Sequence, residues 1–232
     1  MSKTPISSKS LGLAVLALAL LLLSWAYALT AAPPDAQQGM VYKIIFVHVP
    51  SAACALGLSG IGMFVASLLS LIKPSEKALL ANRAWVEVGL AFTCLTLITG
   101  SLWGRPTWGT YWTWDARLTT TLLLALLQIA FLMFYRSLPQ GQQRIRIMGI
   151  LGLIIVIDIP IIYKSVEWWR TLHQPASLIA ERGRTMDSDM LSILLMSLAA
   201  CMLVNFAFWF LRFENLKLQS ELDDITYSAM RS

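Results

Sequence analysis

Charged residues are scarce in this sequence. Only 13% of its 232 residues are Asp, Glu, Lys or Arg, whereas 57% are hydrophobic, and an ordinary soluble domain carries about 25% charged residues. A soluble chain of this length has no core large enough to bury so many apolar side chains, so the composition indicates an integral membrane protein. The net charge of +5 comes from basic residues scattered between apolar blocks. That distribution is typical of membrane loops and argues against a nucleic-acid partner.

Cysteine is also rare. Cys54, Cys94 and Cys201 all lie inside apolar blocks, and the sequence has no CxxC or CxxCH. This pattern argues against a thiol oxidoreductase, a disulfide framework and covalent attachment of a c-type heme to the chain. It favours three buried apolar side chains. The sequence also has no Walker P-loop, so any use of ATP must come from partner proteins.

Six apolar blocks make up most of the chain. They cover residues 11–31, 44–72, 84–103, 118–135, 147–163 and 190–211. Each is close to or above the ~20 residues that cross the hydrocarbon core of a bilayer, and the polar segments between them are too short to fold alone. The sequence therefore predicts an all-α integral membrane protein. Residues 1–232 are expected to form a single domain of six transmembrane helices in one bundle.

The positions of Lys and Arg predict the orientation of these helices. With a cytoplasmic N-terminus, the inside segments hold eleven basic residues and the outside segments seven, as the positive-inside rule requires. Both termini are then cytoplasmic, and residues 33–43, 104–117 and 164–189 face the outer compartment. The first block also resembles a cleavable signal peptide. Its apolar run is longer than the usual core of about 7–15 residues, so we expect it to be retained as a helix.

The segment between the third and fourth blocks is rich in aromatic residues, with five in the twelve positions 103–114. One explanation is an interfacial belt, because Trp and Tyr collect where acyl chains meet headgroups. Gly-Arg-Pro at 104–106 and Trp-Gly at 108–109 instead favour a shaped loop, because these sequences break helices.

Asp115 lies between this loop and the fourth block, where a carboxylate caps free backbone N–H groups and is favoured by the helix dipole. We therefore expect the loop to be anchored rigidly on the fourth helix. Its indoles would form a platform for a flat apolar ligand, and Arg105 or Arg117 would be available for carboxylates. The indoles concerned are those of Trp108, Trp112 and Trp114.

The chain has only two histidines, His48 and His173, and the predicted topology places both at the outer face. A lone histidine near a membrane interface is usually structural. Two imidazoles on one side, flanking an indole platform, are instead suited to the two axial positions of one heme iron. Two histidines on one side do not suffice for a b-type cytochrome that stacks two hemes across the bilayer.

Two acidic residues fall within the predicted spans. Glu87 lies a turn from the cytoplasmic end, where it can reach the interface, and a structural role is favoured. Asp158 lies deeper, beside Pro160, and either satisfies backbone groups freed by the proline or has a functional role. Trp168 and Trp169, in the last outer segment, either close over a ligand or belong to an interfacial belt.

The run Trp-Gly-x-x-Trp-x-Trp-Asp-x-Arg-Leu-Thr at 108–119 resembles the tryptophan-rich WWD motif of heme-handling proteins in cytochrome c maturation. The chain as a whole resembles the heme exporter protein C (CcmC) family. The matching stretches are 47–50, 99–104, 160–162, 165–169 and 172–174. Six spans and a length of about 230 residues also suit that family, so the resemblance covers nearly the whole chain.

This resemblance implies a heme-delivery subunit rather than a classical enzyme, loosely a heme lyase component. It implies that the chain binds heme b without a covalent bond at the periplasmic face of the bacterial inner membrane, and presents it to a periplasmic heme chaperone (CcmE). It also implies partnership with an ATP-binding-cassette pair (CcmA and CcmB) and a small single-span protein (CcmD). Two alternatives remain open: a transporter whose helices form the heme path, and a structural docking subunit.

The resemblance also implies the site. His48 and His173 are its candidate axial ligands. With heme bound there, we expect its propionates to lie near Arg117 or Arg184. The motif residues expected to hold the heme are Trp108, Gly109, Trp112, Trp114, Asp115 and Arg117.

Overall fold

The computed structural model describes residues 8–169, 171–173 and 186–229. Within these residues the secondary structure is helical apart from turns, links and one isolated bridge between Asp35 and Gly39. Its elements are α1 (Ser8–Ala31), the 3-10 helix η1 (Met40–Ile44), α2 (Ile45–Ala52), the π-helix η2 (Ala53–Leu58), α3 (Ser59–Ile72), α4 (Glu76–Trp108), α5 (Ala116–Ser137), α6 (Gln142–Trp168) and α7 (Ser188–Ala229).

Six helical stretches in this described part are long and apolar enough to cross a membrane. The second stretch, Met40–Ile72, combines η1, α2, η2 and α3. This confirms the prediction of an all-α protein with six membrane-spanning helices.

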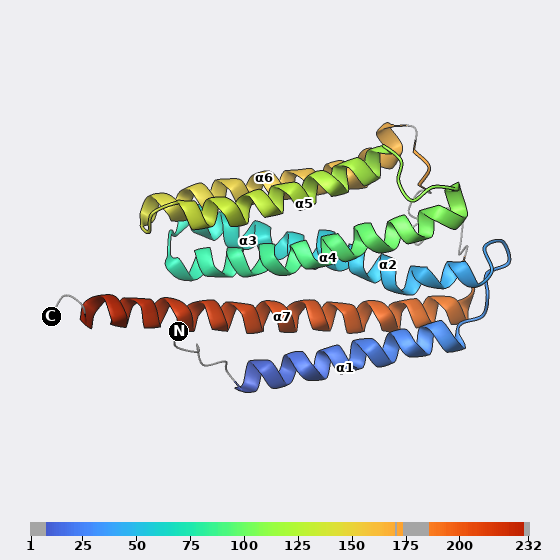
Figure 1. Ribbon diagram of the computed structural model, residues 1–232, viewed down its shortest axis with the longest axis horizontal. Coiled ribbons are helices and arrows are strands. Elements are labelled where there is room, and N and C mark those ends of the chain that lie inside the picture. The colour runs from blue at the N-terminus through green and yellow to red at the C-terminus, as the bar shows by residue number, and fades with distance from the viewer. Residues whose placement is uncertain (1–7, 170, 174–185, 230–232) are drawn as a thin grey trace.

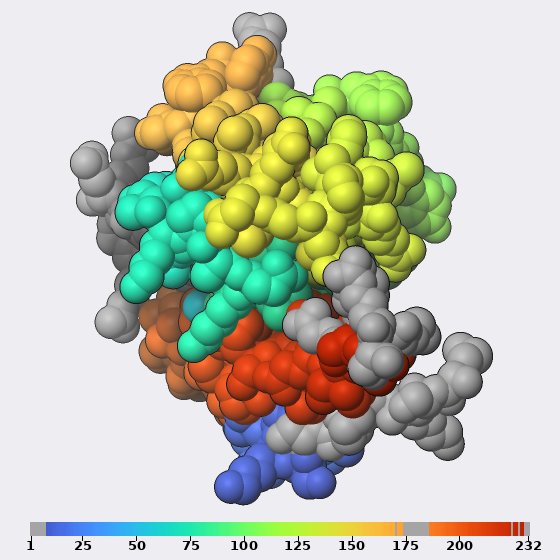
Figure 2. Space-filling model, turned by 90° about the vertical axis from the view of Figure 1, so that its left-hand side faces the viewer, coloured from blue at the N-terminus to red at the C-terminus, as the bar shows by residue number. Residues whose placement is uncertain are grey.

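The helices form layers. A hairpin of α5 and α6 packs on a second layer made by the α2–α3 span and α4, α7 lies beneath it, and α1 packs on the outer side of α7 (Figure 1). Figure 2 shows the same order end-on, from the α5–α6 turn to the blue start of α1. Helix α1 begins and α7 ends at the same end of the bundle as the α5–α6 turn (Figure 1).

The other end of the bundle, the tryptophan end, carries the link from α4 to α5 (Figure 1). Here α4 continues further than the sequence predicts. The sequence predicts a loop over residues 104–117, but the observed loop is shorter. Residues 104–108 still belong to α4, so the loop covers only 109–115. Pro106 lies in the last turn of a 33-residue helix, so it removes a single hydrogen bond there. The helix ends at Gly109, whose φ of 81° is the left-handed conformation that favours glycine.

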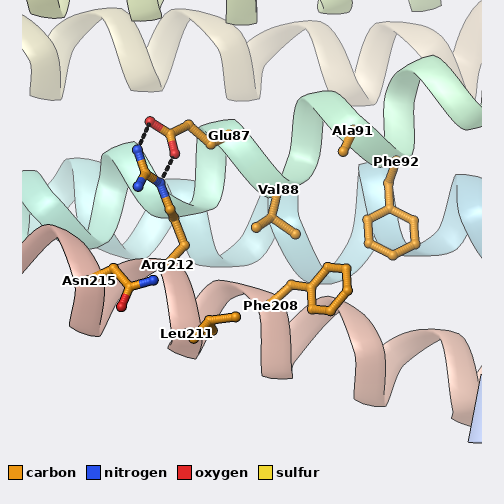
Figure 3. Close-up of a pocket in the computed structure, with 8 residues that line it drawn as sticks. All are labelled: Glu87, Val88, Ala91, Phe92, Phe208, Leu211, Arg212 and Asn215. Atoms are coloured by element: carbon orange, nitrogen blue, oxygen red, sulfur yellow. Dashed lines mark hydrogen bonds and ion pairs between the residues drawn. The ribbon is translucent and has the colours of Figure 1, made fainter. Parts of the chain in front are cut away.

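Glu87 has the structural role that its position near the interface favours. Its carboxylate accepts hydrogen bonds from Arg83 Nε at 2.8 Å and from Arg212 Nη2 at 3.0 Å. Figure 3 shows the pair of Glu87 and Arg212 at the edge of an apolar pocket between α4 and α7. The three charges tie α4 to α7 near the end opposite the tryptophan end.

Asp158 is buried in α6, at 4% exposure. Its Oδ2 atom has no hydrogen-bond partner in the described part of the chain. The structure therefore gives no contact through this oxygen to the backbone near Pro160, which was one of the two roles considered for it.

Candidate functional site

Four segments meet at the tryptophan end and carry the residues singled out in the sequence. They are the start of the second span with His48, the last turns of α4 with Trp103 and Trp108, the loop 109–115, and residues 171–173 after α6. The structure therefore brings both histidines to the same end as the tryptophan loop, which is the loop 109–115.

Asp115 is the most connected residue of this end. It is the N-cap of α5, where Oδ1 accepts the backbone N–H of Arg117 at 3.0 Å. Its Oδ2 accepts the backbone N–H of Leu172 at 2.8 Å and a short hydrogen bond from the Thr171 hydroxyl. His173 Nδ1 lies 3.0 Å from Oδ1. The expected anchor of the loop on α5 is present, and the same carboxylate also holds the segment that carries His173.

The contact with Asp115 fixes the tautomer of His173 in its neutral form. Burial alone would raise the pKa of Asp115, but hydrogen bonds from Thr171 and Leu172 and the nearby His173 hold that pKa below its usual value. Burial lowers the pKa of His173, although Asp115 opposes the shift. A carboxylate only accepts hydrogen bonds, so the proton of the neutral imidazole is on Nδ1. The Nε2 lone pair is then available to bind a metal.

His48 is held by a different partner. Its Nδ1 lies 3.0 Å from Thr99 Oγ1, and the Thr99 hydroxyl donates to the backbone oxygen of Leu95 at 2.7 Å. Because the hydroxyl proton is used in that bond, the oxygen accepts from His48 and the imidazole proton is again on Nδ1. The Nε2 lone pair of His48 is therefore also available.

Aromatic rings pack against each histidine. The His48 ring meets the edge of Trp103 at a centroid distance of 5.7 Å, and the His173 ring meets Trp108 at 4.8 Å. Trp103 was not among the predicted site residues, although it lies in the 99–104 stretch that resembles the family. Both His173 and Arg117 lie close enough to the His48 ring to affect its protonation.

The tryptophan loop is open on one side. Trp114 is 78% exposed and borders a pocket of about 380 Å³ whose other lining residues are Thr113, Asp115, Thr171 and Leu172. The rings of Trp112 and Trp114 meet edge to face, at 5.7 Å and 85°. A flat ligand can therefore lie parallel to only one of these two rings, which corrects the expectation of a single flat platform made by all three indoles.

The two candidate arginines have different surroundings. Arg105 donates a short hydrogen bond from Nη1 to the backbone oxygen of Gly109, and its guanidinium lies 5.7 Å from the centre of the Tyr111 ring. It therefore helps to hold the loop. Arg117 Nε is buried and has no hydrogen-bond partner among the described residues, so this donor is available for an anionic group. Arg184 lies outside the described residues.

Trp168 and Trp169 lie at the tryptophan end but are more than half exposed. Their rings contact each other edge to face at 5.8 Å. The described contacts do not distinguish the two roles considered for them.

Comparison with known proteins gives a consistent result. Residues 4–227 match the family described as heme exporter protein C (CcmC). The chain is 43% identical to the heme exporter protein C of Bradyrhizobium diazoefficiens over 178 residues, which is 76% of this chain and 67% of that protein. It is 38% identical to the heme exporter protein C of Escherichia coli K12 over 209 residues, or 90% of this chain and 84% of that protein.

A plant relative is also similar. Over 160 residues the chain is 42% identical to a putative cytochrome c biosynthesis ccmC-like mitochondrial protein of Marchantia polymorpha, covering 69% of this chain and 67% of that protein.

Proposed function

The chain belongs to the heme exporter protein C family, and on this premise we propose that it binds one heme at the tryptophan end and presents it to a periplasmic heme chaperone (CcmE). The tryptophan end would then face the periplasm, on the outer side of the bacterial inner membrane. Heme is the cargo of this reaction, so the protein acts in delivery and not as a classical enzyme.

The proposal depends mainly on one observation: the Nδ1 atoms of the two histidines both face a hydrogen-bond acceptor, so both rings have the same neutral tautomer. Both His48 and His173 have Nδ1 held by an acceptor, at 3.0 Å in each case, which leaves Nε2 as the ligating atom. Two such imidazoles supply both axial positions of a single heme iron. We therefore assign His48 and His173 as the heme ligands.

The remaining groups suit the other parts of a heme. The exposed face of Trp114 offers an apolar surface for the porphyrin, since flat aromatic groups stack favourably on indoles. The unpartnered Nε of Arg117 is a donor for a propionate, because guanidinium and carboxylate form strong charge-assisted hydrogen bonds.

The site is also suited to handing its ligand over. An open pocket beside a largely exposed Trp114 leaves part of a bound heme accessible to an acceptor. None of the three cysteines is in the loop 109–115, so we propose non-covalent binding of heme b. We further propose that ATP-binding-cassette subunits (CcmA and CcmB) and a small single-span protein (CcmD) complete the assembly, since the chain has no nucleotide-binding motif.

Titration of the purified chain with hemin in detergent tests this function. We expect saturation at one hemin per chain, with quenching of tryptophan fluorescence as the heme approaches the indoles. A chain that takes up no hemin would contradict the proposal and would favour a structural docking subunit.

Cysteine labelling tests the proposed orientation. In a variant with the three native cysteines replaced by Ala, Gln37→Cys at the tryptophan end should react with a membrane-impermeant maleimide in spheroplasts. Gln140→Cys, in the turn at the opposite end, is the matched control and should react only after permeabilisation. Both native glutamines are exposed. The reverse labelling pattern would rule out a periplasmic site.

Gly100 gives a local test of the His48 ligand. A Cβ at this position would lie 3.0 Å from His48 Cε1, so Gly100→Leu is expected to displace the imidazole. We expect the dissociation constant of hemin to rise about 10-fold, the lower range seen when the support of a metal ligand is lost. Gly12→Leu is the matched control, because nothing lies within 4 Å of its Cβ. Unchanged hemin binding by Gly100→Leu would contradict the assignment of His48.

A further inference from the structure

We propose that the two heme ligands are unequal, with His173 the strong ligand that retains the heme and His48 the weak ligand that is exchanged first when the heme leaves. This inference rests on the proposed function, because it requires that both histidines ligate the iron. It adds an order of events to the delivery of heme, which neither the fold nor the family description specifies.

The strength of His173 follows from its partner. A carboxylate that accepts the Nδ1–H of a ligating histidine makes the imidazole a stronger donor and fixes its orientation. The Asp115 side chain is only 2% exposed, so solvent does little to weaken this interaction. Its other hydrogen bonds, from Arg117, Leu172 and Thr171, prevent the carboxylate from turning away.

The partner of His48 is neutral. Thr99 Oγ1 accepts from His48 while the same hydroxyl donates to the Leu95 carbonyl. A hydroxyl is a weaker acceptor for the Nδ1–H than a carboxylate, because charge-assisted hydrogen bonds are roughly twice as strong as neutral ones. It thus polarises the imidazole less. The Nε2 of His48 is therefore the weaker donor to iron.

Packing also separates the two ligands. His173 contacts Trp108, and Asp115 belongs to the same loop as Trp114, so one ligand and the tryptophan loop form a connected unit. His48 instead contacts Trp103 and Thr99, on α4 before the loop. When the bond from iron to His48 breaks, the heme stays with the His173 unit, and the vacant position is open to a donor atom of the acceptor. The exchange leaves the oxidation state of iron unchanged, because His48 keeps the electron pair of the broken bond.

Two nearly isosteric variants test the asymmetry on the hemin-loaded full chain. Asp115→Asn replaces the anionic acceptor of His173 by a neutral amide oxygen and still caps α5, since Asn is a good N-cap residue. Its NH2 group cannot accept the hydrogen bonds that Oδ2 accepts from Leu172 and Thr171. Thr171→Val, which loosens the same segment but keeps the carboxylate, is therefore the control and should speed hemin release less than Asp115→Asn does. Thr99→Val removes the hydroxyl acceptor of His48 and leaves the neutral backbone contact with Thr96. With apomyoglobin as the heme scavenger, we expect Asp115→Asn to speed hemin release by about 10-fold or more, and Thr99→Val to speed it by less than about 3-fold. Unchanged melting temperatures of both apo variants would show that the fold is intact.

Carbon monoxide identifies which ligand is exchanged. In the reduced wild-type complex, CO is expected to replace His48 and to leave His173 opposite it. The iron–carbon stretching frequency in the resonance Raman spectrum should then shift in Asp115→Asn and stay constant in Thr99→Val. A shift in Thr99→Val alone, or equal effects of the two variants on release, would overturn the asymmetry. If the wild-type chain binds no heme, the proposed function itself fails, so the two failures are distinguishable.

Discussion

Replacing His48 and His173 together by Ala is expected to raise the dissociation constant of hemin more than about 100-fold. Loss of a residue that merely supports a metal ligand costs about 10–100-fold in affinity, and this double variant loses both ligands. Hydrophobic contact with the tryptophan loop would account for the binding that remains. Equilibrium titration in detergent measures the change.

Gln140→Ala, at the opposite end of the bundle, is the control for handling and detergent effects. A double His variant that binds hemin as tightly as this control would show that stacking alone holds the heme. In that case the histidines would be structural, which is the usual role of a histidine near a membrane interface.

Glu87→Ala is expected to lower the stability of the end opposite the tryptophan end. It would leave Arg83 and Arg212 without their shared carboxylate (Figure 3). The network is only partly buried, so the cost lies between the ~1 kcal/mol of a surface pair and the ~3 kcal/mol of a buried one. A loss of about 2 kcal/mol corresponds to a fall in melting temperature of roughly 4–8 °C for a chain of this size. Differential scanning fluorimetry of the purified protein measures the shift.

Glu221→Ala is the matched control for this charge effect. Glu221 is more than half exposed and lies 4.0 Å from Lys217 on the same helix, where an ion pair contributes at most ~0.5 kcal/mol. Equal shifts for the two variants would mean that the arginines find other partners and that the network does not tie α4 to α7.

The six spans were predictable because long apolar runs leave few alternatives in a membrane. The boundary of α4 was not. In the sequence, Gly104 and Pro106 are typical of a helix break. Near a helix end, however, a proline removes only one backbone hydrogen bond, so α4 continues to Trp108 and Gly109 is its C-cap. Both Gly104 and Gly109 could end the helix in the left-handed conformation. The packing of the loop, which the sequence does not reveal, decides that Gly109 does so.

The sequence also identified both histidines and the tryptophan motif, but not how they are held. Asp115 and His173 are 58 positions apart, and His48 and Thr99 are 51 apart. No spacing rule connects such residues, because only the packing of α2 on α4, and of the last outer segment on the loop, brings them together. The angle between Trp112 and Trp114 is likewise a tertiary property.

Electron paramagnetic resonance of the one-to-one complex with ferric hemin tests the central claim most directly. Two imidazole ligands give a strong field at iron, so the account predicts a low-spin ferric signal in the wild type. Each single His→Ala variant should convert that signal to high spin, because one axial position is lost. A wild-type complex that is already high-spin, or a low-spin signal that survives in both variants, would contradict ligation of the heme by His48 and His173.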